Sequence, residues 1–358
     1  MRARALLREA GRDIASGTTR LALLTAVFAT MLAALICSDA VSIAKHIRSA
    51  NDFRAAGATT YYVTADDRID PATCENLRSA EGVSAAGALR APSDRVTVAT
   101  LPGSPIPLHE VSPGFAGVLA AESGEPRGVL VSRELSETLG TAPGDAVPSS
   151  HGELRIAAVF DYPSDGRRPG FAYSVLAVSN TPLAFDECWI TVWPQLTNLR
   201  SLLLSTVLPG ADGVSAKQPQ ISQLNPTLGG SFAGDTAFLS RITRANPAVS
   251  ALIGLSLGFL SVRIRRLHIA SALHAGVRRR DVVAIHTLEA SAWSLAACVI
   301  AVGIALGATR LVPEIDQRAI LASLIAIPLA GLAGVLVGAA VSTLLAREKH
   351  LFRFFKDR

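Results

Sequence analysis

The sequence AILASLIAIPLAGLAGVLVGAAVSTLLA, residues 319–346, contains no charged side chain and decides the fold class. A helix that spans a bilayer needs about 20 mainly apolar residues. Pro328 within this stretch permits a kink or tilt. Buried helices of a large soluble core are the alternative, but repeated uncharged runs with basic flanks favour membrane spans. Three further runs of this kind occur at Leu21–Cys37, Pro247–Val262 and Ala290–Ala308.

The composition agrees with a membrane protein that carries one sizeable polar domain. The 358 residues are 49% hydrophobic and only 18% charged, with a mean hydropathy of +0.36, whereas soluble domains are about 25% charged. A water-soluble enzyme is therefore disfavoured. The sequence predicts an α-helical membrane protein with four transmembrane helices (1+3) plus an extracytoplasmic α/β (α+β) domain. The predicted segments are an N-terminal segment 1–20, a first span and start of a stalk 21–43, the polar domain 44–245, a span 246–263, a loop and short helix 264–284, a span 285–308, a short loop 309–318, a span 319–346 and a tail 347–358.

The distribution of Lys and Arg predicts the orientation, because positive charge is retained on the cytoplasmic side. Five basic residues precede the first span, six lie between the second and third spans, and five follow the last. The stretch 45–244 has 16 basic and 20 acidic residues. Both termini and the basic loop are thus expected to be cytoplasmic. A cleaved signal peptide or a lipid anchor at Cys37 is the alternative, but the segment before the run is long and Ile36 stands where such anchors need a small residue.

The polar domain shows alternating strand and helix patterns, which indicate an α/β or α+β fold. Residues 40–56 keep helical spacing and predict a stalk that continues the first span. Asp70-Pro71 predicts a helix that runs to about Ala80, with Asp70 as its N-cap. A second short helix is predicted at Arg133–Leu139, before a Gly144-Asp145 turn. The predicted strands are Thr59–Thr64, Val83–Leu89, Arg95–Leu101, 128–132, Leu154–Phe160 and Ser174–Ser179.

The cysteines predict one disulfide bond. Cys37 and Cys298 lie within spans, whereas Cys74 and Cys188 lie in the polar domain, where an oxidising compartment would close a bond. Two unpaired buried thiols are the alternative. No catalytic or metal-binding pattern accompanies them, since the histidines of the domain, His109 and His151 beyond the stalk, are isolated, and it has no Gly-x-Ser-x-Gly and no Cys-x-x-Cys. The domain is interpreted as a binding or force-transmitting module, and no resident metal, enzyme activity or nucleic-acid partner is expected.

The basic loop RIRRLHIASALHAGVRRRD, residues 263–281, predicts a short amphipathic helix that stops near Gly276. Asp281 is placed to cap the next helix. On physical grounds alone the loop is equally a surface for a protein partner or an anchor on anionic lipid. Glu289, at the inner end of the third span, needs a partner or solvent. We expect pairing with an arginine from 278–280, or a solvated carboxylate.

The order of these segments resembles the permeases of ABC systems of the MacB/FtsX type (type VII). The loop carries Arg265-Arg266-Leu267-His268-Ile269, then Ala272-Leu273-His274-Ala275-Gly276, then Arg278-Arg279-Arg280-Asp281-Val282 and Glu289. Residues 128–135, GVLVSREL, resemble a segment of the family's external domain. His268 stands where the family usually has Glu, and its Gly-Ala pair is inverted here. An electrostatic contact of that Glu with the ATPase would therefore differ.

The resemblance implies the permease subunit of an ATP-driven transporter or mechanotransmission complex. It implies as partners an ABC ATPase, a second permease, membrane lipid and an extracellular enzyme or substrate-binding protein, in a bacterial cell membrane. ATP and Mg would be bound by the separate ATPase, since the sequence has no Gly-Lys pair and so no P-loop. A passive receptor or sensor accessory protein is the alternative function, and a membrane enzyme built around Glu289 is a third. The implied ATPase-coupling residues are Arg265, Arg266, His268, Leu273, Arg278, Arg279, Arg280 and Asp281.

Overall fold

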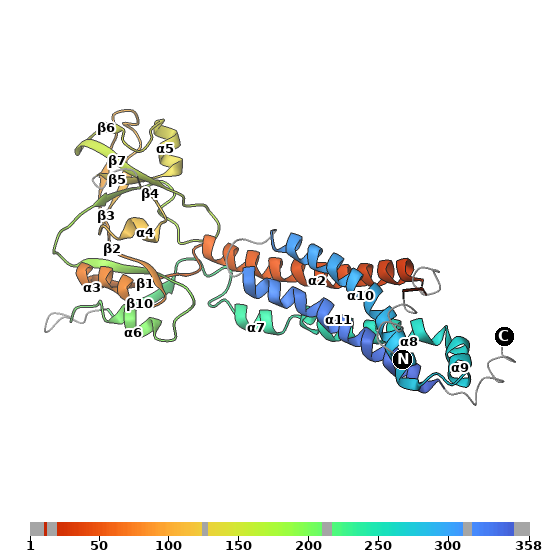
Figure 1. Ribbon diagram of the computed structural model, residues 1–358. Coiled ribbons are helices and arrows are strands. Elements are labelled where there is room, and N and C mark those ends of the chain that lie inside the picture. The colour runs from red at the N-terminus through yellow and green to blue at the C-terminus, as the bar shows by residue number, and fades with distance from the viewer. Residues whose placement is uncertain (1–10, 13–19, 124–127, 210–216, 311–316, 347–358) are drawn as a thin grey trace. The chain divides into compact units, whose positions relative to one another are not determined.

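The computed structural model describes residues 11–12, 20–123, 128–209, 217–310 and 317–346. The tail 347–358, most of the segment 1–20 and part of the loop 309–318 lie outside the described residues. The chain forms two compact units (Figure 1). Residues 1–48 and 233–358 form the helical unit, and residues 49–232 form the sheet unit. Each unit is described by itself.

Four helices of the described chain are long and apolar enough to cross a membrane, by length and composition. The predicted helical class is thereby confirmed. α2 continues without a break beyond the first apolar run, as the stalk prediction required. α10 begins at Arg279, earlier than the predicted residue 285, so Asp281 lies in its first turn instead of capping it; an acidic side chain there still favours the helix dipole. The helices of this unit are α2 (Leu21–Ala55, whose last residues enter the sheet unit), α7 (Gly234–Leu239), the 3-10 helix η2 (Ile242–Ala245), α8 (Asn246–Arg263), α9 (Arg266–His274), α10 (Arg279–Thr309) and α11 (Gln317–Leu345).

α8 and α11 pack with their backbones in contact at glycines. A Cβ atom on Gly334 would lie 2.1 Å from the carbonyl oxygen of Ala251, and one on Gly258 would lie 2.2 Å from that of Val335. Small residues allow such close approach, which drives helix association where lipid removes the hydrophobic effect. Ser250 Oγ donates to the Ile327 carbonyl over 2.8 Å, directly before the buried Pro328. The two helices therefore form a close, hydrogen-bonded pair.

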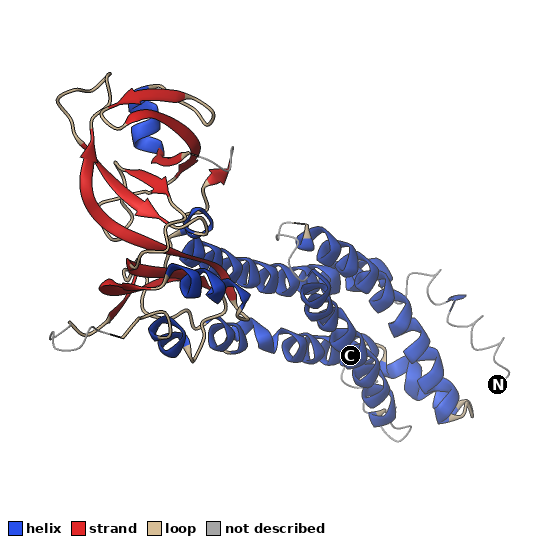
Figure 2. Cartoon of the chain, turned by 90° about the vertical axis from the view of Figure 1, so that its left-hand side faces the viewer, coloured by secondary structure: helices blue, strands red, loops and turns tan. Residues whose placement is uncertain are grey.

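The sheet unit contains a mixed ten-stranded sheet in the order β10-β1-β9-β2-β3-β8-β5-β7-β4, with β6 paired to β7. Figure 2 shows its strands in red. The pairs β3/β8 and β5/β7 are parallel and the others are antiparallel. This confirms the predicted α/β (α+β) class. The strands are β1 (Thr60–Ile69), β2 (Val83–Val96), β3 (Ile106–Val111), β4 (Glu122–Ser123), β5 (Val129–Ser132), β6 (Ala146–Ser149), β7 (Gly152–Phe160), β8 (Val175–Val178), β9 (Phe185–Val192) and β10 (Gln220–Gln223). The helices are α3 (Pro71–Asn76), the 3-10 helix η1 (Leu77–Ser79), α4 (Phe115–Val118), α5 (Arg133–Leu139) and α6 (Leu199–Leu204).

One strand prediction is wrong. The sequence predicts separate strands at Val83–Leu89 and Arg95–Leu101, but β2 runs unbroken through Pro92 to Val96. Its pairing with β3 is irregular between Arg90 and Asp94, and such irregularities are where a sheet accepts proline. The proline therefore marks a bulge and not the end of the strand.

The predicted disulfide is confirmed. Cys74 of α3 is bonded to Cys188 of β9, and both residues are fully buried. Asp70 is the N-cap of α3, with its carboxylate accepting from the backbone N–H groups of Ala72 and Thr73. This cap fixes the start of the helix, and the bond then joins the helix to β9, the third strand from the β10 edge of the sheet.

Candidate functional site

The candidate site lies where α8, α9 and α10 meet in the helical unit. α8 ends at Arg263, the chain turns, and α9 begins at Arg266. Gly276, shortly after the end of α9, has a φ of +84°, a backbone conformation that favours glycine. α10 then begins at Arg279. These two turns, one before α9 and one after it, allow the C-terminal end of α8 to lie beside the first half of α10.

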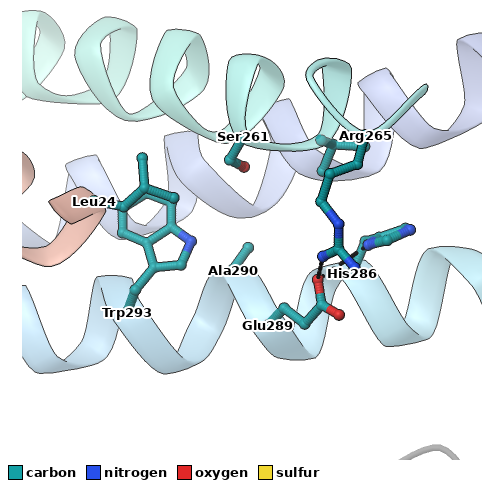
Figure 3. Close-up of a pocket in the computed structure, with 8 residues that line it drawn as sticks. Leu24, Ser261, Arg265, His286, Glu289, Ala290 and Trp293 are labelled. Carbon is teal, nitrogen blue, oxygen red and sulfur yellow. Dashed lines mark hydrogen bonds and ion pairs between the residues drawn. The ribbon is translucent and has the colours of Figure 1, made fainter. Parts of the chain in front are cut away.

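Glu289 of α10 is paired with Arg265, at the turn after α8. Arg265 Nη1 lies 2.5 Å from Glu289 Oε2, and His286 Nδ1 lies 3.1 Å from the same oxygen (Figure 3). The carboxylate is 5% exposed. An unpaired charge at that burial would cost several kcal/mol, so the pairing with Arg265 is what allows a carboxylate here. The cluster joins α10 to the turn after α8, across 24 positions of the chain.

The other carboxylate oxygen, Glu289 Oε1, is buried without a hydrogen-bond partner. Glu289 lines a small cavity together with Leu24, Ser261 and Trp293 (Figure 3). α2 borders this cavity through Leu24 and contacts α10 again, since Thr25 Oγ1 donates to the Trp293 carbonyl over 3.2 Å. The cluster thus lies next to the contact between α10 and α2.

α9 turns its apolar side inward and its polar side outward. Ile269 and Leu273 are buried in the core of the helical unit. His268, Ser271 and His274 are exposed. The outward side therefore has no row of large apolar side chains that could insert into a bilayer, which a lipid-anchoring helix requires.

Basic side chains continue this outward surface beyond α9. Arg278, Arg279 and Arg280 are all exposed, and Arg279 Nη2 donates to the Ala346 carbonyl at the end of α11 over 3.5 Å. Between residues 263 and 281 the sole acidic residue is Asp281, which is buried. The exposed surface formed by His268, Ser271, His274, Arg278, Arg279 and Arg280, which we name the α9 surface, is thus cationic or neutral.

The structure separates the sequence-predicted site residues into two groups. His268 and Arg278–Arg280 are exposed, whereas Leu273 and Asp281 are buried and Arg265 and Arg266 are half-buried. The expected pairing of Glu289 with an arginine from 278–280 is wrong, because the carboxylate is paired with Arg265. The solvated alternative is wrong as well, because Glu289 is buried. Sequence reasoning missed His286, although its i,i+3 spacing to Glu289 on a helix was a usable signal.

In the described part of the sheet unit no group of three or more potential metal ligands occurs. One histidine is unusual there. His109 of β3 is buried, its ring stacks on Phe171 with centroids 4.8 Å apart, and neither ring nitrogen has a hydrogen-bond partner. Burial, with a contribution from the charge of Arg168, lowers the pKa of His109 to about 4. Its ring therefore acts as a neutral aromatic core residue.

No protein-family model and no curated protein matches the chain. Among solved structures, the periplasmic region of MacB from Actinobacillus actinomycetemcomitans is similar, with 10% identity and a TM-score of 0.34 over 49% of this chain and 94% of that one. The extracellular domain of the ABC-type transporter YknZ from Gram-positive bacteria is similar with 13% identity and a TM-score of 0.28, over 40% and 88% of the two chains. At these low values the similarities carry no argument about function. What the fold defines is a helical unit with four candidate spans and a mixed α/β sheet unit.

Proposed function

We propose that the chain is the permease subunit of an ATP-driven transporter or mechanotransmission complex, and that a separate ATPase docks on the α9 surface. The single observation that carries the proposal is the orientation of α9, whose apolar side is buried and whose polar outward side continues into the exposed Arg278–Arg280. A short helix held in this way presents polar side chains, followed by three positive charges, to a protein partner. The family pattern in residues 265–289 supports the same assignment.

A load on α9 would pass into the long helices. Leu273 and Ile269 pack in the same core as Val282 of α10. Arg265 and Glu289 add a charged link between the end of α8 and α10. Since packed side chains are not continuously deformable, movement of α9 would displace these helices together.

From α10 the movement would reach α2. Trp293 of α10 packs edge-on against Phe28 of α2, with ring centroids 5.7 Å apart, and accepts the hydrogen bond from Thr25. α2 is one helix from Leu21 to Ala55 and connects directly to the sheet unit along the chain. In this proposal the ATPase drives the sheet unit through α2. The termini are cytoplasmic, a second permease completes the complex, and an extracellular enzyme or substrate-binding protein is the partner outside.

The test is purification of the tagged chain from its native membrane, with measurement of co-purifying ATPase activity. The variant His268→Glu/Arg278→Glu/Arg280→Glu makes the charge of the α9 surface negative, and we expect that the ATPase no longer co-purifies with it. The matched control Arg200→Glu changes an exposed arginine of α6 in the sheet unit and should retain it. If no ATPase co-purifies with the wild-type chain even after cross-linking, the permease assignment fails and a passive receptor becomes the better function.

A further inference from the structure

A group of apolar side chains is exposed on the segment that precedes α8. We name residues 234–245, which comprise α7 and η2, the elbow. Ile242 is 90% exposed, Leu239 55% and Phe238 37%. Three large apolar side chains at such exposure within five positions are costly in water.

The elbow is continuous with an apolar surface of α8. Val249 and Leu252 of α8 are exposed as well, at the start of a helix long enough to cross a membrane. The stretch Thr236–Arg263 is 28 residues long and contains an 18-residue window that is apolar enough for a span, which needs about 20 residues. Helical geometry is interrupted at Arg241, whose ψ is 133°, and continues as a 3-10 helix from Ile242, so the elbow precedes the span and is not part of its regular helix.

Arg241 fastens the elbow to two other helices. Its Nε donates to Asp39 Oδ1 of α2 over 3.1 Å, and its Nη2 donates to Ser323 Oγ of α11 over 3.2 Å. Both charged side chains are buried, at 7% and 3% exposure. The single cation between the apolar side chains is therefore buried and neutralised by Asp39, and its guanidinium lies over the Phe238 ring, 4.0 Å from the centroid.

We propose that the elbow is an interfacial anchor that inserts Phe238, Leu239 and Ile242 into the boundary between lipid headgroups and acyl chains, at the Asp39 end of the helical unit. The occupant is the bilayer, because the exposed apolar side chains continue the surface of a span and the neighbouring Ser240 and Arg244 are exposed and polar. The pair Arg241–Asp39 holds the anchor at a fixed depth. The proposal rests on the membrane spans and is independent of ATPase docking.

The experiment places a nitroxide spin label at Ile242→Cys in the full chain, with Cys37 and Cys298 replaced by Ser and the Cys74–Cys188 disulfide retained. The protein is reconstituted in vesicles of phosphatidylethanolamine and phosphatidylglycerol. Collision of the label with oxygen, which concentrates in lipid, is compared with collision with a water-soluble nickel chelate. Leu252→Cys on α8 (65% exposed) is the lipid reference, and Leu183→Cys in the sheet unit (64% exposed) is the water reference.

We expect the label at residue 242 to favour oxygen over the chelate, as the label at 252 does, at a shallower depth. A label that behaves like the one at 183 overturns the proposal, and so does a label that neither reagent reaches, since a second copy or another protein would then cover the elbow. Adding Asp39→Asn should raise chelate collision at 242 and leave 252 unchanged. An unchanged label at 242 in that variant would overturn the role of the Arg241–Asp39 pair.

Discussion

The helical unit and the sheet unit differ in which contacts dominate their cores, although both contain close glycine contacts and a paired buried carboxylate. In the helical unit the closest contacts are made where side chains are missing, at Gly258 and Gly334, and charge is buried in pairs. In the sheet unit large rings pack around Trp189, and a disulfide joins α3 to β9. His109 is buried there, stacked on Phe171 and without a hydrogen-bond partner.

The solvent explains the difference. Between membrane helices there is little hydrophobic gain, so backbone contact and polar pairs must hold them together. In water the burial of apolar area stabilises the fold, and large side chains in the core bury the most of it. In the described helical unit, the ion pair Arg265–Glu289 joins the end of α8 to α10, 24 positions apart, and the buried pair Arg241–Asp39 joins the elbow to α2, 202 positions apart. The following experiments would break or sharpen this contrast.

The largest effect is expected from Glu289→Leu, which removes the buried carboxylate that pairs with the half-buried Arg265. Removing one partner of a buried pair costs about 3–5 kcal/mol. Unfolding of the chain in detergent, followed by the circular dichroism of its helices, measures the loss. The double variant Arg265→Met/Glu289→Leu removes both charges and should recover most of the stability. A double variant no more stable than the single one would contradict the importance of the pair.

The sheet unit should lose about 2–5 kcal/mol when Cys74 and Cys188 are both replaced by Ala, because the unfolded chain is then no longer constrained. Urea unfolding monitored by tryptophan fluorescence reports this change. The helical unit, followed by circular dichroism, should unfold at the same urea concentration as in the wild-type chain. The matched control Cys37→Ala replaces a free, exposed cysteine and should change neither transition.

A substitution in the glycine contact should cost about 1–3 kcal/mol, since an added side chain must push two helices apart. Gly334→Val adds atoms against the Ala251 carbonyl. Gly303→Ala is the control on α10, where an added Cβ meets nothing within 4 Å. Thermal unfolding in detergent should separate the two variants. Equal losses would mean that close backbone contact is not what holds α8 to α11.

A further effect, spread over a range of pH, concerns His109. The pKa of His109 is about 4 in the folded chain against 6.5 when unfolded, so the unfolded state binds the additional proton between these values. Stability should rise with pH through this window, by about 1 kcal/mol per pH unit, and the contribution is complete above it. His109→Phe should abolish this slope in urea unfolding of the sheet unit. His151→Phe, at an exposed histidine, should leave it in place.

The elements that could be predicted from sequence are those whose cause is local. Uncharged runs gave the spans, and Asp70-Pro71 gave the start of α3, because the cap and the proline act on adjacent residues. Pro92 misled the strand prediction, since a proline is tolerated at an irregular strand pairing that only the neighbouring strand creates. The disulfide could be predicted because Cys74 and Cys188 both lie in the domain that is expected in an oxidising compartment.

The sequence predicted which residue types make up the candidate site, but not which side chains in it are paired. The basic and apolar residues of 263–281 indicated a helix with a charged surface. The partner of Glu289 depends on where α8 ends relative to α10, and this is set by helix packing. The bond from Arg241 to Asp39 spans 202 positions in the chain, and the residues beside each of them carry no signal of it.

The Cys74–Cys188 bond also determines how the sheet unit responds to tension. The chain enters the unit from α2 and leaves it towards α7, and both connections lie outside the covalent loop that the bond closes. A pull on these two ends runs through β1, the sulfur bridge and β9, and bypasses β2 through β8. Those strands cannot be unravelled until the bridge is reduced. The sheet unit thus has a short extensible length and a larger part that is mechanically shielded.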